Sequence, residues 1–223
     1  MTTKHNRRQW VDKKELYRIF KKGGRWTKLY TRIKFKICPL LAVEPHFPKS
    51  GTVVDLGCGN GLFAAILKLG SPTRQILGFD LDEKKIRMAH ETFDPWTGLK
   101  FQTGNIVEMD YPEADVYSLI DVLYLMPIAA QDIIFKKCRA ALKPGGVLII
   151  KDMDVRPRWK YAWNMLQEIL AVKIIGFTLG GKFHFRSRED YVKTLERIGF
   201  RVDVVALDKG YWYPHILYVC KKI

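Results

Sequence analysis

The stretch Val-Val-Asp-Leu-Gly-Cys-Gly-Asn-Gly at residues 53–61 decides the fold class of this chain. It is an apolar run that ends in an acid and continues into a glycine-rich turn, after which we expect a helix over residues 62–69. A second apolar run ends in Gly-Phe-Asp-Leu-Asp at residues 78–82. Strand, turn, helix and strand in this order predict the first β-α-β unit of a nucleoside-binding α/β fold.

The residues of the turn indicate which kind of nucleoside is bound. Glycines at 57, 59 and 61 let the backbone turn tightly and approach a ligand, because no Cβ stands in the way. Asp80, at the end of the second strand, can accept hydrogen bonds from both hydroxyls of a ribose. A dinucleotide fingerprint would place its third glycine at position 62, which is Leu62 here. Asp55 would lie awkwardly near a pyrophosphate and favours a ligand with a cationic end.

Residues 55–61 resemble motif I of the class I S-adenosylmethionine-dependent methyltransferases, whose pattern is acid-x-Gly-x-Gly-x-Gly. The resemblance covers roughly residues 50–222. The alternative explanation of the motif is an ordinary strand, turn and helix in another kind of α/β protein. It implies a Rossmann-like α/β fold with a seven-stranded, mostly parallel sheet in the order 3-2-1-4-5-7-6, helices on both faces and the last strand antiparallel. It also implies S-adenosyl-L-methionine as the cofactor. The cofactor-binding residues that it implies are Asp55, Gly57, Cys58, Gly59, Asn60, Gly61, Asp80, Leu81, Asn105, Ile106 and Asp121.

The rest of the chain continues this pattern of elements. At the adenine position Asn105 replaces the acid usual in the family, and its carbonyl could still accept a hydrogen bond from the exocyclic amine. Ser187 and Asp190 resemble a capping box at the start of a helix that stops at Gly199. The other predicted elements are a strand ending at 101–105, a fourth strand at 115–121, a helix at 129–142, a turn at 143–146, a fifth strand at 147–151, a helix at 188–198, and strands at 200–207 and 215–220.

The candidate catalytic residues are His184, Asp121 and Tyr124. Methyl transfer from a sulfonium requires a base only when the acceptor must lose a proton. His184 precedes the capped helix, where similar methyltransferases often line the substrate pocket, although a lone histidine is commonly structural. Asp121 and Tyr124 end the fourth strand, and we expect Asp121 to position groups rather than to accept a proton. Two further acids, Asp152 and Asp154, are expected after the fifth strand.

The charge of the chain is concentrated at its N-terminus. Residues 1–50 hold 14 Lys and Arg and 3 Asp and Glu, a net charge of +11, whereas the other 173 residues hold 24 and 20. We therefore expect a basic helical extension over residues 1–49 and a methyltransferase domain over residues 50–223. Four widely spaced cysteines indicate a reducing, cytoplasmic compartment and no metal site. The chain has no run of about 20 apolar residues and no signal peptide is expected.

The basic extension has three possible roles. An apolar helical face is predicted at the positions Trp26, Leu29, Tyr30, Ile33 and Ile37. Residues 10–37 could bind an anionic membrane surface, because basic amphipathic helices with Trp and Leu lie in the lipid interface. They could instead bind nucleic acid, which we consider less favoured. The third possibility is a lid on the active site whose charges are merely solvated.

The sequence predicts a methyltransferase for a small or lipophilic acceptor, peripheral on the inner membrane surface. A Trp-rich segment at 156–179 supports a lipid-like acceptor, since its apolar residues have helical spacing, although core packing would explain it too. Residues 119–151 and 184–199 more loosely resemble small bacterial methyltransferases of lipid-like aryl polyene pathways. One alternative is an RNA methyltransferase guided by the extension, but no Asn-Pro-Pro-Tyr-type motif follows the fourth strand. The other is a non-catalytic nucleoside-binding module, against which Asp55 and Asp80 weigh.

Overall fold

A mixed seven-stranded sheet forms the centre of the molecule. The computed structural model describes residues 11–20, 24–155 and 183–223. The strand order is β3-β2-β1-β4-β5-β7-β6, and β7 runs antiparallel to its neighbours β5 and β6 while the other pairs are parallel. The strands are β1 Gly51–Leu56, β2 Arg74–Asp80, β3 Leu99–Thr103, β4 Ala114–Ile120, β5 Leu142–Met153, β6 Phe200–Ala206 and β7 His215–Lys222. The predicted fold class, strand order and antiparallel last strand are confirmed.

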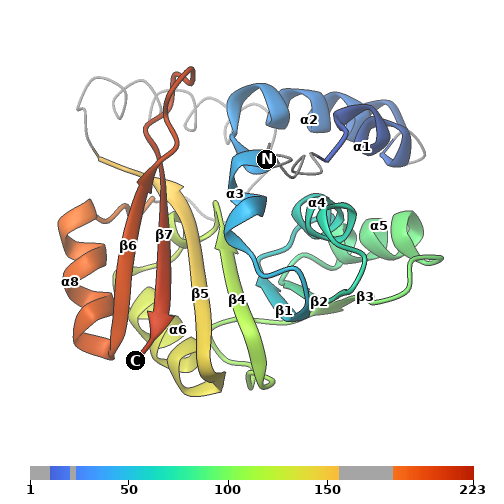
Figure 1. Ribbon diagram of the computed structural model, residues 1–223. Coiled ribbons are helices and arrows are strands. Elements are labelled where there is room, and N and C mark those ends of the chain that lie inside the picture. Colours follow the sequence, from blue (N-terminus) through green and yellow to red (C-terminus); the bar gives the residue numbers. More distant parts are fainter. Residues whose placement is uncertain (1–10, 21–23, 156–182) are drawn as a thin grey trace, which may run out of the picture.

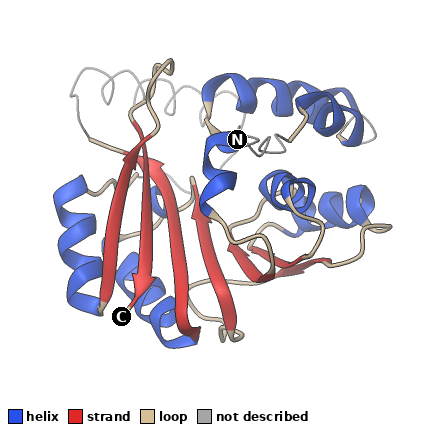
Figure 2. Ribbon diagram, viewed as in Figure 1, coloured by secondary structure: helices blue, strands red, loops and turns tan. Residues whose placement is uncertain are grey.

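Helices cover both faces of this sheet (Figure 2). The helical elements are α1 Lys13–Ile19, α2 Gly24–Ile37, α3 Leu40–Val43, η1 Glu44–His46, α4 Leu62–Gly70, α5 Glu83–Phe93, η2 Leu123–Leu125, α6 Ile128–Ala141 and α8 Arg188–Ile198. Neighbouring residues of a strand point to opposite faces. Val53 accordingly joins a core cluster with α4 and α5, and Val54 joins a second cluster with α6 and α8.

Two predicted boundaries around the central strands were wrong. The fourth strand ends at Ile120, because Asp121 adopts a left-handed backbone with φ 55°. The fifth strand begins at Leu142 and includes the stretch 143–146 that was predicted as a turn. A register shift between β4 and β5 accommodates that stretch. Because β5 continues to Met153, Asp152 lies inside the strand rather than after it, and it accepts a hydrogen bond from the Tyr191 hydroxyl.

Both ends of α8 confirm the prediction. The Ser187 side chain accepts a hydrogen bond from the backbone N–H of Asp190 (3.2 Å), which satisfies one of the free N–H groups at the helix start. The helix ends at Gly199, whose φ of 101° is the left-handed conformation that a helix C-terminus favours.

The N-terminal helices pack on the face that carries α4. Leu16 and Phe20 at α1, and Phe35 at α2, are buried in the same core cluster as the residues of α4. Figure 1 shows α2 across the carboxyl edge, the edge at which the parallel strands end. The boundary at residues 49 and 50 stays a prediction.

The surface through which α2 packs differs from the predicted apolar face. Thr31 and Phe35 are buried, whereas Leu29 and Ile33 are each 48% exposed. The side chains of Trp26 and Tyr30 lie outside the described part of the chain, as does the segment 156–179. Of the predicted face, Ile37 packs against the core, whereas Leu29 and Ile33 lie at the surface, so α2 packs partly through a neighbouring face. The role of the extension as a lid stays a prediction.

Candidate active site at the carboxyl edge

The glycine turn after β1 is held by strand β2 and by the end of β4. The backbone N–H groups of Gly57 and Cys58 donate to the Phe79 carbonyl at 2.7 and 2.9 Å. Gly57 has φ 79°, and a Cβ there would come within 2.5 Å of the Val122 side chain. Gly59 has φ 56°, and a Cβ there would meet nothing within 4 Å. The turn is thus packed tightly beneath Gly57 and open above Gly59, which leaves space for a ligand to approach the backbone.

Asp80 lies next to this open position. Its carboxylate accepts the Gly59 N–H (2.8 Å) with one oxygen and the Asp82 N–H (2.9 Å) with the other. An ionised carboxylate offers about four lone-pair sites, so roughly two remain for hydroxyl donors. Leu81, which follows, is 59% exposed and can contact a ligand through its apolar side chain. Asp80 therefore has the hydrogen-bonding capacity that a ribose requires.

Asp55 lies beneath the turn and is buried. One carboxylate oxygen accepts a hydrogen bond from the Ser118 hydroxyl (2.7 Å), and the other has no partner among the described residues. Burial raises the pKa of Asp55 to about 7, the Ser118 hydrogen bond opposes this shift, and the nearby Asp80 adds to it. A cationic ligand group would complete this site, because it would stabilise the ionised carboxylate.

Three other predicted cofactor residues have mainly structural contacts. The Cys58 thiol is buried, and a Cβ at Gly78 would lie 2.8 Å from its sulfur, so Cys58 is a packing residue. The Asn105 side-chain carbonyl accepts the Val107 N–H (3.0 Å) and so holds the turn after β3. Ile106 is buried in the core cluster with α6. Asn60 is half-buried in the turn.

Asp121 is the centre of a buried polar cluster at the end of β4. Its carboxylate accepts hydrogen bonds from Lys34 Nζ (3.0 Å), Cys38 Sγ (3.2 Å) and Lys151 Nζ. Burial alone would raise the pKa of Asp121, but Lys151 and Lys34 outweigh it and hold that pKa well below its ordinary value. A carboxyl group with a lowered pKa is ionised near neutral pH and is a weak proton acceptor, and the positioning role expected of Asp121 stays a prediction.

His215, at the start of β7, adjoins this cluster. Its Nε2 lies 2.7 Å from the Ile37 carbonyl, and because a carbonyl only accepts, Nε2 carries the proton. Burial and then Lys151 lower the pKa of His215 to about 3, so the ring is neutral. Burial and then Asp121 raise the pKa of the Cys38 thiol to about 11, so Cys38 is a neutral donor.

The structure brings two of the candidate catalytic residues, His184 and Tyr124, into backbone contact. The His184 N–H donates to the Tyr124 carbonyl (2.7 Å), and the His184 carbonyl accepts from the Gln131 side chain (2.9 Å). The Tyr124 ring is buried and stacks on Phe185 at 5.2 Å between ring centres, with Phe183 at 5.9 Å. These three rings form an aromatic cluster, and the half-buried His184 lies between Phe183 and Phe185 in the sequence and is held to Tyr124 through its backbone.

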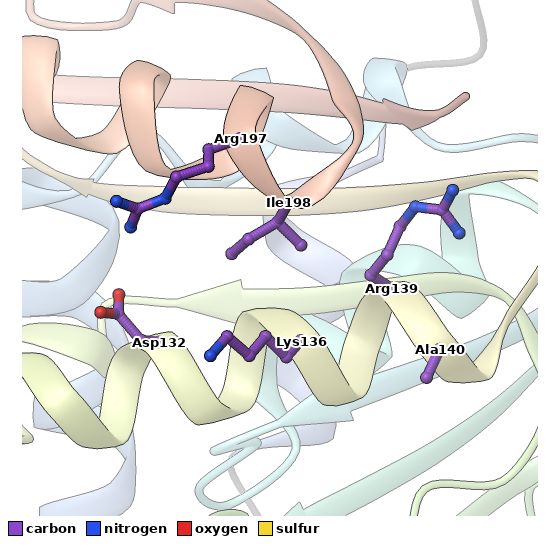
Figure 3. A pocket seen from close by; sticks show the side chains of 6 residues that line it. All are labelled: Asp132, Lys136, Arg139, Ala140, Arg197 and Ile198. Atoms are coloured by element: carbon purple, nitrogen blue, oxygen red, sulfur yellow. The ribbon is translucent and has the colours of Figure 1, made fainter.

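Among the described residues, a cavity of about 410 Å³ lies elsewhere, between α6 and α8 (Figure 3). Its lining residues are Asp132, Lys136, Arg139, Ala140, Arg197 and Ile198. None of them is a predicted site residue, and both helices cover a face of the sheet instead of its carboxyl edge. We therefore do not assign the cofactor or the acceptor to this cavity.

The comparison with known families is decisive. A family model described as "Methyltransferase domain" matches residues 48–198, about two thirds of the chain. The chain belongs to this methyltransferase family. The predicted class I methyltransferase and its cofactor, S-adenosylmethionine, are thereby confirmed at the level of the family.

Curated relatives of this methyltransferase have different named activities. The carboxy-S-adenosyl-L-methionine synthase of Chromohalobacter salexigens is 30% identical over 122 residues, which are 52% of this chain and 45% of the relative. The ribosomal RNA large subunit methyltransferase G of Pseudomonas syringae is 33% identical over 123 residues, 49% of this chain and 32% of the relative. The chain spans less than half the length of these relatives.

Solved structures share the fold of this methyltransferase. Human N-acetylserotonin methyltransferase, solved in complex with S-adenosylmethionine, has a TM-score of 0.64 and 20% identity. The match covers 96% of this chain and 57% of the human one. At this identity the likeness shows the fold alone.

Sequence reasoning missed four residues of the methyltransferase's carboxyl edge: Ser118, Lys34, Lys151 and His215. Ser118 could have been found, because it faces Asp55 in the parallel register of β1 and β4. Lys151 carried a signal too, since a lysine at the end of a buried apolar strand requires a partner. Lys34 and His215 had no signal of their own, because their contacts join segments far apart in the sequence.

Proposed function

We propose that this chain is an S-adenosylmethionine-dependent methyltransferase that acts on a small or lipophilic acceptor at a membrane surface. The observation that carries the cofactor assignment is the buried carboxylate of Asp55, one oxygen of which has no partner among the described residues, together with the open position of Gly59 in the turn that follows β1. Asp80 would hold the ribose hydroxyls, and Asp55 would face the cationic end. When bound, the cofactor supplies a methyl group activated on a sulfonium.

The aromatic cluster supports a lipophilic acceptor. Tyr124, Phe183 and Phe185 form a contiguous apolar surface beside His184. Such a surface excludes water and favours an aromatic or acyl group over a charged one. If the acceptor atom is a hydroxyl, His184 is our candidate to take its proton, and Asp121 keeps the role of a positioning group. The looser resemblance to aryl polyene methyltransferases stays a prediction.

Asp80→Ala tests the cofactor assignment. The substitution removes the acceptor of the ribose hydroxyls, and hydrogen bonds to a charged group contribute about 1.5–3 kcal/mol. We expect calorimetric titration with S-adenosylhomocysteine to show at least about a ten-fold loss of affinity. Glu83→Ala, an exposed acid three residues on, is the control and should bind normally. A folded Asp80→Ala protein with unchanged affinity would remove Asp80 from the site.

The exposed apolar residues at the carboxyl edge support the membrane assignment. Leu29 and Ile33 project from α2, next to the exposed cations Arg32 and Lys36. Trp212 is 71% exposed in the loop between β6 and β7, which rises on the side of α2 in Figure 1. Cations around exposed apolar side chains complement an anionic lipid surface. None of the described helices is long and apolar enough to cross a membrane.

Ile33→Glu tests this assignment by co-sedimentation with anionic vesicles. It places a carboxylate in the lipid-facing surface and removes the burial of one Ile, about 1.5–3 kcal/mol, so binding should weaken roughly ten-fold or more. Ile133→Glu is a matched control, because Ile133 is 45% exposed on α6, away from the carboxyl edge. High salt should weaken vesicle binding without abolishing it.

The second candidate function is that of an RNA methyltransferase. Two observations favour it: the similarity to a ribosomal RNA methyltransferase and the +11 charge of residues 1–50. Binding to RNA should fall steeply with salt, because counterion release drives it. Salt-sensitive binding of tRNA, with equal vesicle binding by Ile33→Glu and Ile133→Glu, would reject the membrane assignment in favour of RNA.

A further inference from the structure

Four contacts attach the C-terminal end of α2 to the carboxyl edge, one of them a hydrogen bond from Lys151 Nζ to Cys38 Sγ (3.3 Å). Lys34 Nζ donates to Asp121 after β4 (3.0 Å), and Cys38 Sγ donates to the same carboxylate (3.2 Å). His215 Nε2 of β7 donates to the Ile37 carbonyl (2.7 Å). The N-terminal extension therefore supplies side chains to the edge that holds the glycine turn.

The charges of this cluster indicate what Lys34 does. Lys151 is fully buried and already pairs with Asp121, so one ammonium group balances the carboxylate without Lys34. The side chain of Lys34 is 24% exposed, and its ammonium group adds a second positive charge to the cluster. Because charge balance does not require Lys34, its contribution is to connect α2 with Asp121.

The backbone of Asp121 links this contact to the glycine turn. Among the described residues, Asp121 alone has a positive φ without being glycine, a conformation that persists only when surrounding contacts hold it. Its N–H donates to the Lys151 carbonyl (2.9 Å). The next residue, Val122, packs directly under Gly57, within 2.5 Å of where a Cβ would lie. Any contact that holds Asp121 in place thus also holds the floor of the turn.

We propose that Lys34 is a positioning residue of this methyltransferase: it fixes Asp121 and, through Val122, couples the docking of α2 to cofactor binding at the glycine turn. This inference rests on the proposed function for its cofactor. Its structural part, the coupling of Lys34 to the backbone at Asp121 and Gly57, does not need a ligand. Coupling between two sites is reciprocal, so the cofactor should also strengthen the docking of α2.

The test compares Lys34→Met with Lys36→Met, which removes the same charge from an exposed position of the same helix. Without ligand, hydrogen exchange is measured at the Asp121 and Gly57 amides, which donate to Lys151 and Phe79. We expect faster exchange at both amides in Lys34→Met and wild-type rates in Lys36→Met. With S-adenosylhomocysteine, Lys34→Met should bind about five-fold or more weakly, the lower end of typical coupling between sites.

Lys34→Arg retains the cation and should recover most of the affinity, which a loss of general stability would not predict. Wild-type exchange at both amides in a folded Lys34→Met protein would overturn the proposal, as would unchanged affinity for S-adenosylhomocysteine. If the wild type itself does not bind S-adenosylhomocysteine, the proposed function fails. The ligand-free exchange would then still decide whether Lys34 positions Asp121.

Discussion

Asp121→Asn is expected to lower the free energy of unfolding by about 3–5 kcal/mol, as measured by urea denaturation. The substitution leaves the ammonium groups of Lys151 and Lys34 without a counter-charge, and the Lys151 side chain is fully buried. Removing one partner of a buried ion pair is costly because the remaining charge has lost its water and its partner. Asparagine tolerates a left-handed backbone, so the φ of 55° adds little to this cost.

Asp203→Asn provides the control for this substitution. Asp203 on β6 is 61% exposed and pairs with Lys221 at 3.9 Å, a surface pair whose loss should cost about 1 kcal/mol or less.

The stabilisation that Asp121 provides depends on pH, because its pKa in the folded protein is held below the ordinary value. This stabilisation is fully present above the pKa of the unfolded state, about 3.9, and is lost only as the pH falls through the pKa of the folded state. The contribution of the Asp121 ionisation to the difference between wild type and Asp121→Asn should therefore be constant from about pH 5 to 8. Equal effects of Asp121→Asn and Asp203→Asn would show that the cluster is not buried as described.

Gly57→Ala should cost more stability than Gly59→Ala, whereas Gly59→Ala should weaken ligand binding directly. A Cβ at Gly57 would overlap the Val122 side chain. Overpacking should lower the free energy of unfolding by about 1–3 kcal/mol, and the strain of a left-handed backbone should lower it by about 1–2 kcal/mol more. A Cβ at Gly59 meets no protein atom and carries only the strain. It would fill the space beside Asp80, however, and should weaken S-adenosylhomocysteine roughly ten-fold or more, by the same overpacking cost.

Gly145→Ala is the matched control for Gly59→Ala. Gly145 has φ 72°, and a Cβ there would also meet nothing within 4 Å, but it lies in the first residues of β5, at the opposite edge of the sheet from the glycine turn. Both substitutions should cost the same stability, and only Gly59→Ala should lose affinity. Equal affinities in the two variants would place the ligand away from the turn.

Local patterns allowed much of the fold to be predicted. The glycine turn, the acid near the end of each of the first two strands and the caps of α8 each depend on a few neighbouring residues, and the structure confirms these elements. The strand order came from the family resemblance, because periodicity alone does not order strands in a sheet. The end of β4 was misplaced because nothing in the sequence marks the left-handed backbone of Asp121.

The buried cluster could not be predicted in the same way. Lys34 and Asp121 are 87 positions apart, and Cys38 and Lys151 are 113 apart, so their contacts exist only once α2 packs on the sheet. The buried face of α2 was missed for a related reason. Apolar spacing identified Leu29 and Ile33, but tertiary contacts selected Thr31 and Phe35.

Calorimetric titration of the wild-type chain with S-adenosylhomocysteine and, separately, with NAD tests the central claim most directly. Asp80 offers an acceptor for a ribose, Gly59 an open backbone, and Asp55 a buried carboxylate that is unsuited to a pyrophosphate. We therefore expect saturable binding of S-adenosylhomocysteine and no binding of NAD. Binding of NAD without binding of S-adenosylhomocysteine would contradict the account.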